Sequence, residues 1–342
     1  MLMQPRTWMK TTGGAGKSGQ HVRISAAHAE WNHVGIALAA MDLGIFAEEG
    51  LTDVEAISFD EESGALLDRE RVQVDLLASG QVDLAIDPQT RFLLQARSNG
   101  KPVSIIAARR RTHAFVLIGE RGLSSIQDLK GCTLCTSDVG GANDIMLRQV
   151  LQDSGIDPEV DVKITYSGMA MHDTRGATVA FTEGRYGPAI LASTAAWRGL
   201  VDAGYPMLVD LRVLYPSRHD RVTAANSDFA AANPDLLRGF LRGMMRGWAW
   251  ILNPANATQF KEIVVESGFL TEEHDRQSFD GLFAGWRERG SIDLSLPRDG
   301  IELIVDESKR NHLIPDSFDT DDVLDLGPLH EAHRELGIAA PA

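Results

Sequence analysis

The stretch GIALAAMDLGIFAEEGLTDVEAISF at residues 35–59 decides the fold of this 342-residue chain. Residues 35–47 form an amphipathic stretch that indicates a helix, and residues 53–57 form a short β-branched and aliphatic run that indicates a strand. The same order returns in LLASGQVDLAI at residues 76–86, where a helix passes through a glycine turn into a buried strand. Repeated helix-to-strand units of this kind predict an α/β fold.

The alternation continues over most of the chain. Short aliphatic runs predict strands at residues 22–25, 53–57, 82–86, 103–107, 133–136, 162–165 and 189–192. Amphipathic stretches predict helices at residues 35–47, 64–79, 91–99, 141–154 and 175–184. From Asp228 onward we expect helices only, beginning with residues 235–252, whose broad apolar stripe is typical of a helix packed on a core.

Composition excludes several classes of function. The chain has 48 acidic and 33 basic residues and a formal charge of -15, which repels phosphate backbones and anionic membranes, so we expect no nucleic-acid partner. No stretch approaches the roughly 20 apolar residues of a membrane span. Cys132 and Cys135 are the only cysteines, and their offset of three in a predicted strand directs them to opposite faces, against a redox or zinc site.

The chain shows no internal repeat and no low-complexity linker, so a second domain is expected to be inserted into the first. The predicted parts are a flexible tail at residues 1–20, a first lobe at 21–112 and 222–342, and an inserted second lobe at 113–221. Residues 1–20 lack the apolar run of a secretion signal. We therefore expect a cytoplasmic protein as the sequence is written, and a periplasmic or extracellular one if a leader precedes it.

Four segments, in this order, resemble the NMT1/THI5-like family of sulfonate, taurine and thiamine-precursor binding proteins. They are residues 35–59, residues 76–86, GLSSIQDLKGCTLCTSDVGGANDIMLRQVLQDSGID at 122–157 and NSDFAAANPDLLRGFLRGMMRGWAWI at 226–251. The resemblance implies a two-lobed, periplasmic-binding-protein-like type II fold with a ligand cleft between the lobes. It also implies a substrate-binding protein that carries a small organic ligand to the membrane subunits of an ABC transporter. We expect no cofactor.

The candidate site residues lie in loops that follow strands. Open parallel sheets bind ligands at the carboxyl ends of strands, where helix N-termini offer free N–H groups to anions. The candidate ligand-binding residues are His28, Trp31, Asn32, His33, Gln89, Thr90, Arg109, Arg111, His113, Gly140, Gly141, Asn143, Ser167 and Ser193. Trp31 could instead pack for stability, and Thr90 could instead cap a helix. The spacing of His28, Glu30 and His33 is unspecific for a metal, and none is expected.

The arginine run at residues 109–111 is one candidate for holding an anion. A planar guanidinium binds carboxylate, sulfonate or phosphate bidentately, and strand alternation would send Arg109 and Arg111 to one side and Arg110 to the other. The alternative is a solvated cluster on an edge strand. Asp87 could pair with an arginine across the cleft.

The glycine turn at Gly140 and Gly141 is the second anion candidate. It lets a ligand approach the backbone at the start of a predicted helix, whose N–H groups can hold an anion. Asp138 and Asp144 count against this hypothesis, because they would repel an anion or take the same N–H groups as caps.

The sequence favours a protein that binds a small organic anion, but the fold alone does not exclude an enzyme. The alternative is a cytoplasmic desulfinase-like or decarboxylase-like enzyme acting on an aromatic or small organic acid, with His28 and His113 as proton donors. Desulfinase-like relatives use a nucleophilic cysteine in the loop after the first strand, and this loop has none. A regulatory or interaction protein is the third alternative, and the ligand and oligomeric state stay open.

Overall fold

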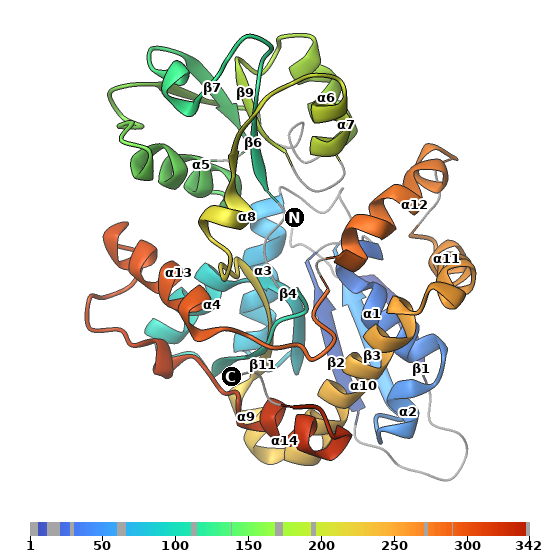
Figure 1. The fold of residues 1–342 in the computed structure, drawn as a ribbon. Coiled ribbons are helices and arrows are strands. Elements are labelled where there is room, and N and C mark those ends of the chain that lie inside the picture. Colours follow the sequence, from blue (N-terminus) through green and yellow to red (C-terminus); the bar gives the residue numbers. More distant parts are fainter. Residues whose placement is uncertain are drawn as a thin grey trace. The chain divides into compact units, whose positions relative to one another are not determined.

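The structure is a computed structural model of the whole chain. It describes residues 6–11, 21–27, 31–59, 66–110, 115–137, 139–167, 174–192, 196–269, 273–288 and 290–339. Helices and strands alternate along the chain, which confirms the predicted α/β class (Figure 1). The chain divides into a first unit of Met1–Arg111, Ser217–Phe283 and Gly290–Ala342, and a second unit of Thr112–Pro216 and Ala284–Arg289.

A six-stranded sheet with the order β1-β3-β2-β4-β11-β5 organises the first unit. Its strands are β1 (Arg6–Thr11), β2 (His21–Ala26), β3 (Asp53–Ser58), β4 (Leu84–Gln89), β5 (Val103–Ala107) and β11 (Arg221–Asn226). β2 is parallel to β3 and β4, while β11 runs antiparallel between β4 and β5. The carboxyl ends of β2, β3, β4 and β5 therefore share one edge of the sheet with the first residues of β11.

Helices surround this sheet. They are α1 (Trp31–Asp42), α2 (Ile45–Glu48), α3 (Leu66–Ala78), α4 (Thr90–Ser98), α9 (Ser227–Ala232), α10 (Pro234–Leu252), α11 (Ala257–Glu266), α12 (Glu273–Glu288), α13 (Arg298–Arg310) and α14 (Gly327–Leu336), with the 3-10 turns η4 (Pro254–Asn256) and η5 (Thr320–Asp322). In the described part of the chain, no helix combines the length and the apolar character that crossing a membrane requires.

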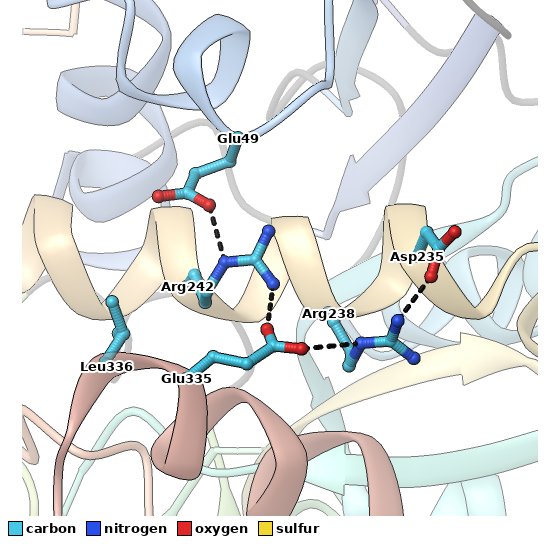
Figure 2. Close-up of a pocket in the computed structure, with 6 residues that line it drawn as sticks. All are labelled: Glu49, Asp235, Arg238, Arg242, Glu335 and Leu336. Carbon is cyan, nitrogen blue, oxygen red and sulfur yellow. Dashed lines mark hydrogen bonds and ion pairs between the residues drawn. The ribbon is translucent and has the colours of Figure 1, made fainter.

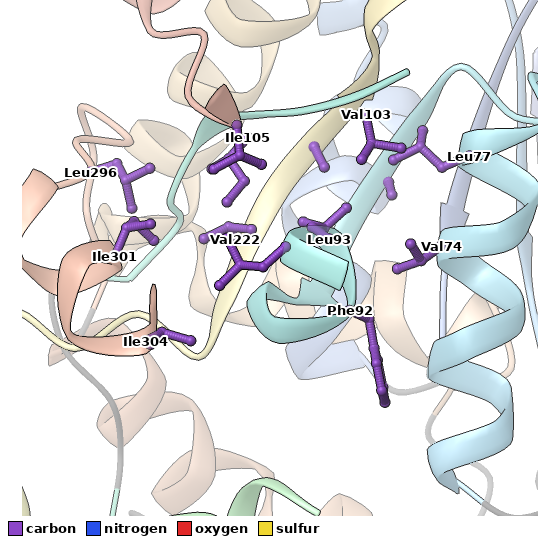
Figure 3. Packing of buried hydrophobic residues seen from close by; sticks show 14 of the residues in the cluster. Val74, Leu77, Phe92, Leu93, Val103, Ile105, Val222, Leu296, Ile301 and Ile304 are labelled. Atoms are coloured by element: carbon purple, nitrogen blue, oxygen red, sulfur yellow. The ribbon is translucent and has the colours of Figure 1, made fainter. Parts of the chain in front are cut away.

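The core of the first unit joins three of these helices to the sheet. Figure 3 shows Leu77 of α3, Leu93 of α4 and Ile301 of α13 converging with Ile105 of β5 and Val222 of β11. β4 and β5 are buried along their whole length, and the apolar first half of β4 and the mostly apolar β5 are typical of strands covered on both faces. This packing fixes the ends of β4 and β5, where polar residues begin.

The second unit contains two smaller sheets. One has the order β10-β6-β9 and the other pairs β7 with β8. The strands are β6 (Val116–Gly119), β7 (Thr133–Thr136), β8 (Lys163–Tyr166), β9 (Ala189–Ala192) and β10 (Met207–Asp210), and the helices are η2 (Ile126–Leu129), α5 (Ala142–Asp153), α6 (Thr174–Thr182), α7 (Ala196–Asp202) and α8 (Leu211–Leu214). A core of its own, including Leu134, Met146 and Val150, packs α5 on these strands.

The predicted elements are confirmed with small shifts. All seven predicted strands are present within three residues of their expected bounds. The predicted helix at 35–47 is divided into α1 and α2, because Gly44 adopts a left-handed conformation with φ of 72°. The expectation of a tail without structure over residues 1–20 is wrong for Arg6–Thr11, which form β1 and pair with β3.

Candidate functional site

The candidate site lies at the carboxyl edge of the sheet in the first unit and centres on Asp87 of β4. Asp87 is 1% exposed and has φ of 60°, in the left-handed region that residues other than glycine seldom adopt. Pro88 follows it, and a residue before proline normally prefers extended backbone. Such a conformation costs about 1–3 kcal/mol and persists only where surrounding contacts fix it.

Three side chains fix the Asp87 carboxylate. Arg109 grips it bidentately, with Nε donating to Oδ1 at 3.0 Å and Nη2 donating to Oδ2. Arg110 Nη2 lies 3.2 Å from Oδ2, and His33 Nδ1 lies 2.6 Å from the same oxygen. Burial alone would raise the pKa of Asp87, but Arg109, Arg110 and His33 hold it well below its ordinary value. The carboxylate is therefore ionised at neutral pH.

A second layer of charged residues supports this centre. Arg221, the first residue of β11, donates from Nη1 to the backbone oxygen of Asp87 at 3.0 Å and pairs through Nη2 with the buried carboxylate of Glu70. Glu70 also accepts from Gln89 Nε2, and Gln89 Oε1 accepts from Arg91 Nε at 2.8 Å. The contacts therefore run without interruption from His33 to Arg91.

Counted by direct contacts, this network contains four arginines and two carboxylates, and the nearby carboxylates of Asp220 and Glu307, which pair with Arg218, also act on Arg91. Its arginines are Arg91, Arg109, Arg110 and Arg221, and its carboxylates are those of Asp87 and Glu70. Two buried N–H groups, Arg109 Nη1 and Arg91 Nη2, have no hydrogen-bond partner within the described structure. A buried donor left without an acceptor costs about 1–3 kcal/mol. The oxygens of a carboxylate or sulfonate would supply both the missing acceptors and the missing negative charge.

Arg91 is the least constrained cation of the network. Its guanidinium lies over the ring of Phe92, 4.5 Å from the centroid. Burial lowers the pKa of Arg91 to about 10, and Glu70 opposes this shift. The side chain is still charged at neutral pH, and Glu307 and Asp220 join Glu70 in stabilising that charge.

The glycine turn in the second unit is arranged differently. Gly140 has φ of 64°, and its N–H donates to Asp144 Oδ2 at 2.7 Å. Asp144 is buried and also accepts from Arg148 Nε at 2.9 Å, while Tyr166 Oη lies 3.4 Å from Oδ1. At Gly140, therefore, Asp144 itself accepts the backbone N–H, as the alternative considered in the sequence analysis predicted. Ligand contact by Gly140, Gly141 and Asn143 stays a prediction.

The other described candidates have specific partners. Trp31 is buried in an aromatic cluster, 4.8 Å from the ring centroid of Phe279 and 6.2 Å from that of Phe260. Thr90 Oγ1 donates to the backbone oxygen of His219 at 2.5 Å, so it serves a neighbouring loop and does not cap α4. Ser167 Oγ donates to the backbone oxygen of Thr136 at 3.3 Å and joins the ends of β7 and β8. Asn32 Oδ1 is buried without a hydrogen-bond partner among the described residues.

His28, Arg111, His113 and Ser193 lie outside the described residues, as do Glu30 and Asp138. Their predicted roles stay predictions. The structure thus brings His33, Gln89 and Arg109 together in one network.

Two expectations about the arginine run are wrong. Arg109 and Arg110 do not point to opposite sides but reach the same carboxylate, because β5 ends at Ala107 and the alternation of a strand ends with it. Asp87 does not pair across lobes, since both arginines belong to its own unit.

Sequence reasoning also missed Glu70, Arg91 and Arg221 as members of the network. A signal existed for Glu70 in α3. Glu70 and Gln73 fall on the same helical stripe as Val74 and Leu77, at the spacing of three and four that marks a core face. A charged residue within an apolar stripe indicates a buried ion pair.

A separate hollow of about 470 Å³ lies between α10, α14 and the turn after α2. Figure 2 shows Arg242 between Glu49 and Glu335, and Arg238 between Glu335 and Asp235. Arg242 Nε lies 2.6 Å from Glu49, and Arg238 Nε lies 3.2 Å from Glu335. Three carboxylates face two guanidiniums here, so the hollow has no surplus of cations. Its ion pairs connect α14 to α10.

The described residues contain no group of three or more His, Cys, Asp or Glu side chains placed to hold a metal ion.

Comparisons with known proteins agree on the fold. A family model described as NMT1/THI5 like matches residues 30–257. The chain is similar to the putative sulfonate ABC transporter, periplasmic sulfonate-binding protein SsuA from Methylobacillus flagellatus KT, with 18% identity, a TM-score of 0.68 and coverage of 95% of this chain and 97% of that one. It is also similar to the periplasmic aliphatic sulphonate binding protein SsuA from Escherichia coli, with 16% identity, a TM-score of 0.67 and coverage of 90% and 92%.

The periplasmic nitrate-binding protein NrtA from Synechocystis PCC 6803 is a third similar structure, with 15% identity, a TM-score of 0.65 and coverage of 93% of this chain and 89% of that one. No curated protein matches the chain in sequence. The structural likenesses confirm the predicted periplasmic-binding-protein fold.

Proposed function

Since the chain belongs to the NMT1/THI5 like family, we propose that it is a substrate-binding protein that captures a small organic anion and hands it to the membrane subunits of an ABC importer. The observation that carries the proposal is the group of arginines around Asp87, of which Arg109 is buried, with N–H groups of Arg109 and Arg91 that lack acceptors. The names of the similar structures support it, since two are sulfonate-binding proteins and one binds nitrate.

The Asp87 carboxylate would act as a positioning group in this function. It engages Nε and Nη2 of Arg109 and so fixes the plane of the guanidinium, which leaves the buried Nη1 as the donor that lacks an acceptor among the described residues. A fixed guanidinium loses little side-chain entropy on binding, and so the anion is bound more tightly. In a protein with a formal charge of -15, a local cationic surplus also concentrates the attraction for an anion at one place.

We place the protein on the side of the membrane from which an importer collects its ligand. The three similar structures are named as periplasmic proteins and support this location. Detection of the protein in periplasmic fractions or in the medium would agree with it, and detection in the cytosol alone would contradict it.

The binding proposal is tested first by native mass spectrometry of the freshly purified protein, in which a retained small acid is expected. Titration calorimetry then compares benzoate with benzamide and ethanesulfonate with ethanol, pairs that differ in charge. We expect the anions to bind and their neutral partners to bind at least tenfold more weakly. Neutral partners that bind as tightly as the anions would contradict the proposal.

Arg91→Gln tests the residue assignment. We expect it to weaken binding of the anion by about 1.5–3 kcal/mol, the contribution of a hydrogen bond to a charged group. The matched control is Arg298→Gln, which removes an arginine of the same unit whose partners Glu302 and Asp321 lie at the surface. An equal loss in both variants would remove Arg91 from the site.

The enzyme alternative rests on His28 and His113, and the same samples test it. Benzoate, benzenesulfinate and ethanesulfonate are incubated for a day with stoichiometric protein and then analysed by mass spectrometry. A binding protein returns each compound intact. Conversion of any of them, lost on His28→Ala, would establish the enzyme instead.

A further inference from the structure

The strand β5, which directly precedes the arginine segment in the sequence, is covered on its outer side by residues from the C-terminal part of the chain. Ile105 N–H donates to the Val323 oxygen at 2.8 Å, and Asp325 N–H donates to the Ile105 oxygen at 2.9 Å. An edge strand covered in this way has its backbone groups satisfied and its path fixed. These C-terminal residues lie beyond residues 30–257, which the family model matches.

The arginine segment itself is held by a loop at residues 290–295. Ala108 N–H donates to the Leu294 oxygen at 2.9 Å, and Ser291 N–H donates to the Arg109 oxygen at 3.2 Å. Arg110 and Gly290 form an antiparallel bridge directly beside them. The loop therefore contacts the backbone on both sides of the Arg109 side chain.

The loop keeps a conformation that needs support. Leu294 is 1% exposed and has φ of 53°, a left-handed backbone that is unfavourable for leucine. Asp293 stabilises the turn by accepting from Ser291 Oγ at 2.5 Å, Ser295 Oγ at 2.8 Å and Ser295 N–H at 3.2 Å. Burial alone would raise the pKa of Asp293, but these hydrogen bonds hold it below its ordinary value.

One side chain from outside the loop completes this support. His333 of α14 is fully buried, and its Nε2 lies 2.6 Å from the Asp293 backbone oxygen. Nδ1 of the same ring has no hydrogen-bond partner within the described structure. Because the carbonyl can only accept, Nε2 carries the proton and donates.

Helix α14 has further attachments that do not depend on this hydrogen bond. Leu329 and Ala332 are buried beside His333, Glu331 pairs with Arg238 of α10, and Glu335 pairs with Arg238 and Arg242 in the hollow of Figure 2. Removing the imidazole donor therefore leaves the helix attached and removes one support of the loop.

We propose that His333 is a positioning residue of the anion site, acting through Asp293 and the 290–295 loop on the backbone that carries Arg109 and Arg110. This inference rests on the proposed function for its effect on affinity. His333 lies about forty positions after the loop in the sequence and contacts Asp293 directly, so it would act on the arginines only through the loop.

The test uses His333→Leu, which keeps an apolar side chain and removes the donor. His333→Gln serves as the rescue variant, because its Nε2 stands the same number of bonds from the backbone as Nε2 of histidine. His330→Ala is the matched control on the exposed side of the same helix. All are made in the full chain.

Hydrogen exchange of peptides covering residues 106–110 and 290–295 is measured, together with affinity for benzoate and ethanesulfonate. We expect His333→Leu to raise exchange at Ala108 and Ser291 by about tenfold and to weaken anion binding by about fivefold to tenfold, corresponding to one lost hydrogen bond. For His333→Gln and for His330→Ala, we expect exchange rates and anion affinities within about twofold of those of the original protein.

Unchanged exchange at Ala108 and Ser291 in His333→Leu would overturn the proposal. A rise spread evenly over β2, β3 and β4 would also overturn it, since that outcome shows general destabilisation. Faster local exchange with unchanged affinity would overturn the role in binding. If neither anion binds the original protein while exchange responds as expected, the proposed function fails and the support of the arginine segment by His333 stands.

Discussion

Two regions of the chain carry the sequence features of an anion site, and the structure treats them in opposite ways. Around Asp87 in the first unit, four arginines meet two carboxylates and leave buried N–H groups without acceptors. At the turn before α5 in the second unit, the buried carboxylate of Asp144 takes the N–H of Gly140 and the guanidinium of Arg148. The first region contains more arginines than carboxylates in direct contact, whereas the donors of the second are satisfied by its own carboxylate.

From these contacts we infer that the balance of charge is a better guide to an anion site than a glycine motif. Glycines at the start of a helix indicate accessible N–H donors, but an aspartate three residues into the helix can satisfy them from within the chain. A surplus of buried guanidinium cannot be satisfied in this way once the nearby carboxylates are used. Burying unbalanced charge is expensive, so such a surplus points to a partner that the protein itself does not contain.

An isosteric substitution of each central carboxylate should affect the two regions very differently. Asp87→Asn keeps a side chain that tolerates left-handed backbone, but it leaves Arg109 and Arg110 buried without their counter-ion. We expect the free energy of unfolding to fall by about 3–5 kcal/mol. Asp144→Asn, the matched change in the second unit, is expected to cost about 1 kcal/mol, because Arg148 is partly exposed.

Urea unfolding of both variants provides the measurement. If Asp87→Asn and Asp144→Asn lose similar amounts of unfolding free energy, the Asp87 carboxylate contributes no more to stability than the Asp144 carboxylate at the glycine turn.

The dependence of stability on pH should show the same contrast. The pKa of Asp87 in the folded protein lies well below the value of 3.8 for an unperturbed carboxyl, which the unfolded chain retains. Its contribution to stability is therefore complete above about pH 4 and is lost as pH falls further through the folded pKa. Between about pH 4 and pH 2, the free energy of unfolding should fall less steeply in Asp87→Asn than in the original protein. Parallel slopes would show that Asp87 is not the group whose pKa is lowered.

Much of the fold followed from the sequence, because the strands of α/β units are short apolar runs and their helices have clear periodicity. The strands β1, β6, β10 and β11 were missed, although Val116–Gly119 is as apolar as the strands that were predicted. All four pair antiparallel with neighbouring strands, whereas the predictions considered only the parallel strands of α/β units.

The site was predictable only in part. The topology implies that polar residues gather in the loops after β2, β4 and β5, and His33, Gln89 and Arg109 were found on this argument. Arg221 was missed because antiparallel β11 brings the start of a strand to an edge where the argument considered only strand ends. Which side chain pairs with which depends on the path of the backbone after Ala107, and a sequence does not specify that path.

The smallest expected effect tests the glycine turn itself. Gly140→Ala adds a methyl group in open space, so its cost comes from the left-handed backbone alone, about 1 kcal/mol in the free energy of unfolding. Gly155→Ala is the matched control, because Gly155 follows the other end of α5 with φ of 73° and equally open surroundings. If Asp144 already satisfies this turn, both variants should lose similar stability and keep anion affinity within about twofold. The two variants share the backbone strain and differ only in position. If calorimetry finds binding at least tenfold weaker in Gly140→Ala and unchanged in Gly155→Ala, the turn at Gly140 is part of the ligand site.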